Sequence, residues 1–175
     1  QIRHRLLQLF EQAHLEKDEA ALQRMMNIVV VGGGPTGVEV SGALAEMKQY
    51  VLPKDYPELD FTRMNIFLLE GAEKTLAAMR EKSSRRSGEY LEKLGVKLMT
   101  KTLVKNYDGQ EVELNTGEKI PAATVIWAAG IKGNIPGGID KSLIARGNRI
   151  KTDRYCRVQG FDNVYAIGDL AYMET

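Results

Sequence analysis

With 175 residues, of which 43% are hydrophobic and 27% charged, the chain has the composition of a soluble globular protein and the length of one domain, or of one domain with pieces of another. Its 24 basic and 23 acidic residues give a formal net charge of +1, which offers no electrostatic argument for nucleic acid or for strong adhesion to an anionic membrane. The lone Cys156 excludes an intrachain disulfide and a CxxC pair, whether redox-active or zinc-binding, and no apolar run reaches the roughly 20 residues that cross a bilayer.

The first part of the chain has the pattern of a helix, a buried strand, a glycine turn and a second helix. Residues 2–24 carry apolar side chains at roughly helical spacing and predict one amphipathic helix. Residues 27–31 form a short β-branched run, typical of a parallel strand that is buried on both faces. Residues 32–37 turn the chain sharply, and helical spacing returns over residues 38–47.

A second strand and helix are predicted after an irregular insertion. The segment 48–64 contains two prolines and cannot be a regular helix throughout. Residues 65–69 predict a strand that ends in Glu70. A helix is then expected from about Ser83, as its N-cap, to Leu94, with a glycine at its stop.

The following segment predicts an antiparallel ribbon and one more buried strand. Turn signals at Asp108-Gly109 and Thr116-Gly117 separate short strands whose outer faces are charged. The apolar run over residues 124–128 predicts the buried strand, which leads into Ala129-Gly130.

The last part of the chain changes character. Residues 131–148 are rich in glycine, as in a connection between domains. Residues 149–153 and 163–167 predict strands of a different sheet, and a further helix is expected to begin within residues 171–175. Because the chain also lacks an initiator Met, we expect it to be a piece of a larger protein.

The glycine turn matches the pattern G-x-G-x-x-G between a strand and a helix, which is the context that a dinucleotide-binding loop requires. Gly32 would permit the tight turn, Gly34 would let a pyrophosphate approach the backbone, and Gly37 would let the helix pack close to the sheet. Free N–H groups at the helix start would point at the phosphates, assisted by the helix dipole. The alternatives are a glycine turn without a ligand and the similar loop of a Rossmann methyltransferase.

Glu70 is the second half of this signal. An acid at the end of the second strand can accept both hydroxyls of an adenosine ribose and would repel a 2′-phosphate. No arginine follows directly, so NADH is favoured over NADPH, although Lys74 lies close in sequence. The alternative is an exposed acid at a strand end. Glu39 is expected in the first turn of the helix behind the loop, where the dipole alone could explain a carboxylate.

The motifs resemble those of two-dinucleotide flavoproteins, and among these the chain looks most like type II NADH dehydrogenase, the single-subunit NADH:quinone oxidoreductase. The resemblance covers most of the chain, and Trp127-Ala128-Ala129-Gly130 and the Asp55-Tyr56-Pro57 insertion point to this subfamily. The motifs that carry it, in family order, are Val29–Glu39, Leu69-Glu70, Val125–Gly130 and Val164–Ala171.

The resemblance implies an α/β fold with a Rossmann-like NADH-binding domain over residues 27–130. Residues 1–26 would be a helix of the connection from an FAD-binding domain, and residues 131–175 an incomplete return into it. The cofactor-binding residues would be Gly32, Gly33, Gly34, Pro35, Thr36, Gly37, Glu39, Glu70, Ala129, Gly130, Gly168 and Asp169.

The resemblance implies a role for each of these motifs. Glu39 would lie near the nicotinamide carboxamide, and Ala129-Gly130 would line the path of the nicotinamide to the flavin. Gly168-Asp169 would be the second flavin motif, whose Asp would hydrogen-bond the FAD ribityl chain. Its alternative is a Gly-Asp turn before a helix, with Asp169 as a cap.

The implied reaction takes hydride from NADH to FAD and passes electrons to a quinone without pumping protons, with no catalytic side chain and no metal in this chain. Only one glycine fingerprint is present, so the FAD site is incomplete and the isolated chain is expected to be inactive. The parent would lie peripherally on the cytoplasmic side of the membrane, through a region absent here, with a homodimer possible in principle. Alternatives are ferredoxin, sulfide:quinone or disulfide reductases, and a non-catalytic NADH-binding module.

Overall fold

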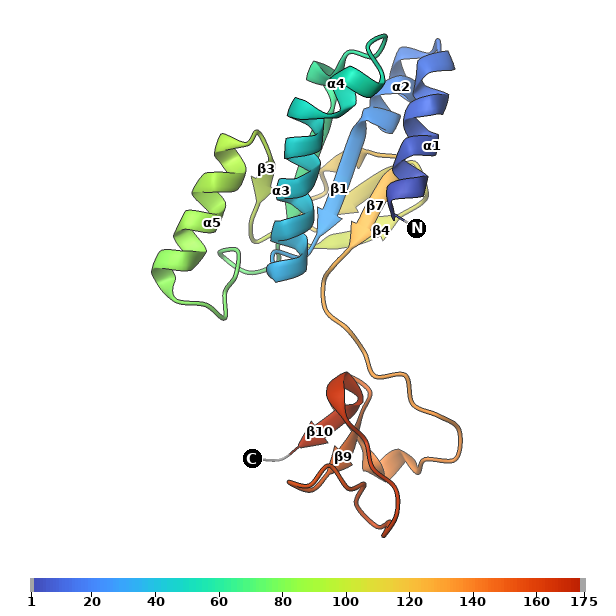
Figure 1. The fold of residues 1–175 in the computed structure, drawn as a ribbon, viewed down its shortest axis with the longest axis vertical. Helices are drawn as coiled ribbons and strands as arrows, with labels where there is room; N and C mark the ends of the chain where they lie inside the picture. The colour runs from blue at the N-terminus through green and yellow to red at the C-terminus, as the bar shows by residue number, and fades with distance from the viewer. Residues whose placement is uncertain (1, 174–175) are drawn as a thin grey trace. The chain divides into compact units, whose positions relative to one another are not determined.

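The structure is a computed structural model that describes residues 2–173. Its contacts divide the chain into two compact units, Gln1–Ala129 and Gly130–Thr175 (Figure 1). The first unit is built on a parallel sheet, and the second has a small core of its own around Ile150, Val158 and Ala166.

The sheet of the first unit has the strand order β3-β2-β1-β7, and all its pairs are parallel. Val31 lies opposite both Leu69 and Trp127, so the carboxyl ends of three neighbouring strands meet at one edge. The bounds of these strands are β1 Asn27–Val31, β2 Asn65–Leu69, β3 Lys97–Met99 and β7 Thr124–Trp127.

Strand β1 is buried along its whole length, as its sequence predicted. Because successive side chains of a strand point to opposite faces, Ile28 and Val30 join the core beneath the helices. Val29 and Val31 join a second core that includes Val112 of the antiparallel ribbon. The sheet therefore lies between a layer of helices and the ribbon.

The ribbon consists of β4 Val104–Tyr107, β5 Glu111–Leu114 and β6 Lys119–Pro121, and it confirms the prediction made from the two turn signals. Gly109 and Gly117 both have positive φ, at 94° and 85°.

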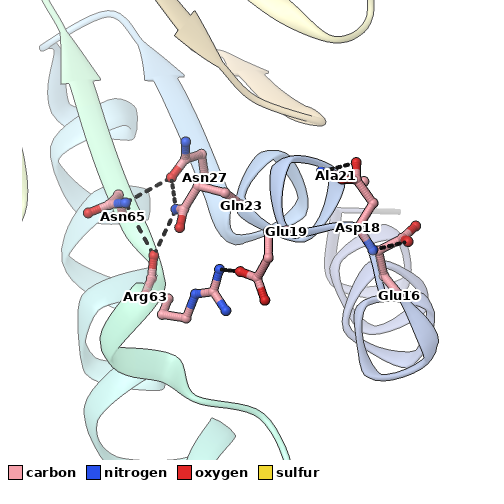
Figure 2. Close-up of polar contacts among 8 residues, drawn as sticks. All are labelled: Glu16, Asp18, Glu19, Ala21, Gln23, Asn27, Arg63 and Asn65. Atoms are coloured by element: carbon pink, nitrogen blue, oxygen red, sulfur yellow. Dashed lines mark hydrogen bonds and ion pairs between the residues drawn. The ribbon is translucent and has the colours of Figure 1, made fainter.

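The helix expected over residues 2–24 is in fact two helices, α1 Ile2–Leu15 and α2 Glu19–Met26. The break follows from Asp18, whose carboxylate accepts the Ala21 N–H at 2.9 Å and caps α2 (Figure 2). Asp competes with the helical backbone in mid-helix and is favoured at caps, so the apolar spacing alone missed this break.

The helix after the glycine loop, α3 Pro35–Tyr50, begins three residues earlier and ends three residues later than the predicted 38–47. Proline fits the first turn of a helix because its missing N–H would have no partner there. The insertion is not a regular helix throughout, as expected, and it contains α4 Leu52–Asp55 and the 3₁₀ turn η1 Phe61–Arg63.

The next helix, α5 Glu81–Lys93, begins before Ser83, so the expectation that Ser83 caps it was wrong. Arg80 is the N-cap residue and gives no side-chain cap. The neighbouring Ser84 is buried and donates its hydroxyl to the Thr75 carbonyl at 2.5 Å. The serines of this helix thus join it to the preceding loop.

The second unit confirms one predicted strand and corrects two other expectations. Residues 163–167 form no strand, and Tyr165 makes only an isolated bridge to Arg157. The chain continues into a strand where a helix was expected, because residues 171–173 pair in parallel with β9. Glu174 and Thr175 lie outside the described residues. The elements are η2 Lys141–Leu143, β8 Ile144–Ala145, β9 Arg149–Thr152, η3 Gly168–Leu170 and β10 Ala171–Met173.

Amide side chains around the buried Asn27 join α2 to the amino ends of β1 and β2. Asn27, only 5% exposed, accepts from the side chains of Gln23 at 2.9 Å and Asn65 at 2.8 Å (Figure 2). Its own amide donates to the Pro121 carbonyl at 2.7 Å. Each polar atom of Asn27 is therefore used to fix these elements together.

Among the described residues, no helix combines the length and the apolar character needed to cross a membrane.

Candidate functional site

The residues of the predicted nucleotide site in the first unit gather at the carboxyl edge of the parallel sheet. Gly32 follows β1, Glu70 follows β2 and Ala128 follows β7. Ligands of open α/β sheets bind at this edge, where the strand order reverses between neighbouring connections. The register of the strands thus brings together three motifs that lie far apart in the sequence.

Gly32 and Gly37 are required by close backbone approaches. Gly32 has φ of 107°, and a Cβ there would lie 2.7 Å from the Ala128 carbonyl oxygen. A Cβ at Gly37 would lie 1.8 Å from the Gly32 carbonyl oxygen and 3.5 Å from Leu68. Gly37 therefore lets the first turn of α3 approach the end of β1, as expected from the fingerprint.

Gly34 is different, because a Cβ there would meet nothing within 4 Å. It is the N-cap residue of α3 and provides no side-chain cap, and Pro35 follows it. The N–H groups of Thr36 and Gly37 belong to the first turn, where backbone donors have no intrahelical acceptor. Open space thus lies beside a helix start with free donors, which suits an anionic group.

The Glu70 side chain reaches back to the glycine loop. Its Oε2 accepts the Gly33 N–H at 2.5 Å, and its Oε1 accepts the Ala72 N–H at 2.7 Å. Gly33 is buried and Glu70 is half-buried. The two halves of the fingerprint, which are separate motifs in the sequence, are therefore joined directly by a hydrogen bond.

The loop after Glu70 also supports the site, and no pattern in the sequence indicated this. The Leu76 N–H donates to the Gly33 carbonyl at 2.7 Å. The Thr75 hydroxyl lies 2.6 Å from that of Ser87 on α5. The loop is thereby tied both to the glycine loop and to the helix that follows it.

Two cations near this loop have carboxylate partners. Lys74 is paired with Glu81, and the Nζ of Lys101 lies 2.8 Å from Oε1 of Glu73. Both pairs are exposed and contribute little to stability. Lys74, which could have received a 2′-phosphate, is paired with Glu81 in this structure.

Glu39 is exposed and is the fifth residue of α3, so the expectation that it lies in the first turn was wrong. The helix starts earlier than the apolar spacing suggested, and a dipole effect that fades within the first turn explains Glu39 less well. Ala129 is exposed, and its Cα lies 2.8 Å from the position of a Cβ on Gly32. Ala129 therefore borders the glycine loop.

The remaining predicted residues lie in the second unit, which is described by itself. Gly130 and Gly168 have positive φ, at 89° and 67°. Asp169 is the second residue of η3, with an exposed side chain, and its carbonyl accepts from Arg149 Nε at 3.1 Å. The N-cap residue is Ile167, so the alternative in which Asp169 caps a helix was wrong.

A pocket of about 550 Å³ lies between the carboxyl ends of α3 and α5. It is lined by residues such as Ala45, Lys48, Phe61 and Leu94, and by none of the glycine loop. Burial and nearby Lys97 lower the pKa of Lys48, whose ammonium donates to the Met64 carbonyl at 2.6 Å. This pocket does not belong to the candidate nucleotide site.

Comparison with known proteins gives consistent results. A family model described as pyridine nucleotide-disulphide oxidoreductase matches residues 4–175. The chain is 31% identical over 186 residues to a type II NADH:quinone oxidoreductase of Mycobacterium tuberculosis, covering 99% of this chain and 39% of that protein. It is 35% identical to a mitochondrial external alternative NAD(P)H-ubiquinone oxidoreductase of Arabidopsis thaliana, covering 97% of this chain and 30% of that protein.

Among solved structures, the chain matches NDH2 of Plasmodium falciparum in complex with NADH, with a TM-score of 0.83 and 26% identity. The match covers 98% of this chain and 37% of that one. These comparisons confirm the predicted α/β, Rossmann-like fold and the resemblance to type II NADH dehydrogenases. The chain spans about two fifths of the length of the first of these relatives.

Proposed function

Because this chain belongs to the pyridine nucleotide-disulphide oxidoreductase family, we propose that its first unit binds NADH at the carboxyl edge of the parallel sheet. One observation carries the proposal: the open space beside Gly34 lies at the start of α3, and Glu70 is hydrogen-bonded to the adjacent Gly33. The loop offers donors for a pyrophosphate, and the acid offers acceptors for a ribose.

The proposed pose follows from the chemistry of each side of the site. The pyrophosphate lies against Gly34 and receives N–H groups from Thr36 and Gly37. The adenosine ribose faces Glu70, and the nicotinamide extends toward Ala129 and Gly130, with Glu39 near its carboxamide. Exposure of Glu39 and Ala129 supports this pose, because both are accessible to a ligand.

For the whole protein we propose the reaction of an NADH:quinone oxidoreductase that pumps no protons. FAD, when bound, supplies the chemistry that accepts hydride from NADH and passes the electrons on to a quinone. The residues of this chain bind and orient the nicotinamide, which is the main contribution a protein makes to such a transfer. Gly168 and Asp169 would hold part of the flavin, and the exposed Asp169 carboxylate is free to accept from hydroxyl groups.

The domain assignment, membrane association and assembly belong to the same proposal. Residues 131–175 would belong to the FAD-binding part of the protein, and residues 1–26 would be the connection from it, packed on the first unit through Leu6 and Phe10. The parent protein would lie peripherally on the cytoplasmic side of the membrane that contains its quinone. A homodimer is part of the same proposal. The sequence similarity to NADH:quinone oxidoreductases supports the quinone as the electron acceptor.

The activity is tested on the whole protein, loaded with FAD, by following NADH absorbance with a short-chain quinone as acceptor. We expect quinone-dependent oxidation of NADH, faster than that of NADPH. Turnover with a ferredoxin or a disulfide and none with quinone would assign the protein to another branch of the family. Saturable NADH binding with no turnover of any acceptor would favour a non-catalytic module.

A further inference from the structure

The missing side chain of Gly33 leaves the space that Glu70 occupies. The φ of Gly33 lies outside the left-handed region, so its backbone conformation does not by itself require glycine. A Cβ there would lie 2.8 Å from Glu70 Oε2 and 3.0 Å from both Cβ and Cγ of Glu70. Turning the carboxylate alone would relieve only the first contact, so a side chain at this position would press on Glu70, which must shift by a few tenths of an ångström or more to make room.

Hydrogen bonds hold both the backbone and the carboxylate of Glu70 in place. Its backbone N–H donates to the Met99 carbonyl at 2.9 Å, and its own carbonyl accepts the Thr102 N–H at 2.9 Å. Its carboxylate accepts from Gly33 and from Ala72. The position of the carboxylate is therefore fixed before any ligand arrives.

The bonds to the backbone leave capacity for a ligand. An ionised carboxylate has about four lone-pair sites, and the two N–H groups use two of them. The rest match the pair of hydroxyls of an adenosine ribose. A 2′-phosphate would meet this fixed negative charge, and Glu70 could turn away only by losing two charge-assisted hydrogen bonds.

We propose that Gly33 is a positioning residue that sets the selectivity of this site for NADH over NADPH. It does so by leaving room for Glu70 and by holding the carboxylate with its N–H group, so that the acid faces the ribose. The inference rests on the proposed binding of NADH and identifies what enforces the choice of cofactor.

The test measures NADH and NADPH dissociation constants for the 175-residue chain and its variants. Gly33→Ala and Glu70→Ala should each reduce the ratio of NADPH to NADH dissociation constants by about tenfold, since hydrogen bonds to a charged group are at stake. The double variant should have the ratio of Glu70→Ala alone, because no carboxylate remains to be displaced.

Gly34→Ala is the matched control, since Gly34 has an ordinary φ of −73° and open space beside it. Its added methyl group should weaken NADH and NADPH binding alike and leave the ratio unchanged. NADH binding with an unchanged ratio in Gly33→Ala would overturn the inference and leave the proposed function intact. A folded wild-type chain that binds no NADH would overturn the proposed function itself.

Chemical denaturation provides a readout without ligand. Gly33→Ala should lower the midpoint of unfolding, and this loss should largely disappear when Glu70→Ala removes the contacts to Cγ and Oε2. If Gly33→Ala does not fold, recovery of the fold in the double variant would support the inference. Losses that simply add, or a double variant that is also unfolded, would contradict it.

Discussion

At the scale of single residues, the glycines of one loop have different reasons to be glycine. Gly37 is fixed by a neighbouring backbone, because a Cβ there would lie 1.8 Å from the Gly32 carbonyl oxygen. Gly34 meets no such neighbour. The fold therefore requires glycine at position 37, whereas at position 34 glycine would be required only by the proposed ligand.

Alanine at these two positions should separate stability from binding. Gly37→Ala should lower the free energy of unfolding by about 1–3 kcal/mol or more, because the loop or α3 must shift. Gly34→Ala should change it by less than about 1 kcal/mol, since a lost N-cap preference and a reduced unfolded-state entropy oppose each other. Gly34→Ala should nevertheless bind NADH more weakly, because its methyl group occupies the space proposed for the pyrophosphate.

Denaturant unfolding of both variants, followed by NADH titration, checks this prediction. Equal losses of stability in the two variants would show that both glycines serve the fold. Unchanged NADH affinity in Gly34→Ala would show that the pyrophosphate does not lie against this residue.

The fingerprint predicted the packing of Gly32 and Gly37, because their spacing is tied to a strand, a turn and a helix. It gave no role to Gly33. The reason is that Gly33 is constrained by Glu70, which lies 37 positions away in the sequence and comes close only through the pairing of β1 with β2. A local pattern does not contain such a contact.

At the scale of elements, the amide of Asn27 joins α2, β1, β2 and the end of the ribbon. Asn27→Ala would remove the acceptor of Gln23 and Asn65 and the donor to Pro121. Because these partners would keep their polar groups in a partly buried place, we expect a loss of about 1–3 kcal/mol in the free energy of unfolding.

The matched control is Asn106→Ala, whose side chain is exposed on β4. This control should change the free energy of unfolding by less than about 0.5 kcal/mol. Equal midpoints of urea unfolding for the two variants would contradict the structural role of Asn27.

Strands with uninterrupted apolar runs were predicted closely, as β1 and β2 show. Helix limits were predicted less well, because they depend on caps such as Asp18 and on Pro35 at the start of α3. The strand β10 was mistaken for a helix, since its conformation follows from pairing with β9 and three residues carry no periodic signal.

At the scale of the whole molecule, the composition changes after Gly130, and the contacts divide the chain between Ala129 and Gly130. Each unit has its own buried core. The short strands of the second unit were only partly predicted, because so small a sheet is decided by contacts between distant segments. The closeness of the glycine fingerprint and Glu70 was predicted best, since a regular parallel sheet brings them together.

The most direct test of the account is a calorimetric titration of the 175-residue chain with NADH, with circular dichroism to verify that the chain is folded. The account predicts saturable binding with a dissociation constant of about 1 mM or lower, and weaker binding of NADPH. A folded chain that shows no saturable heat through the millimolar range of NADH would contradict it.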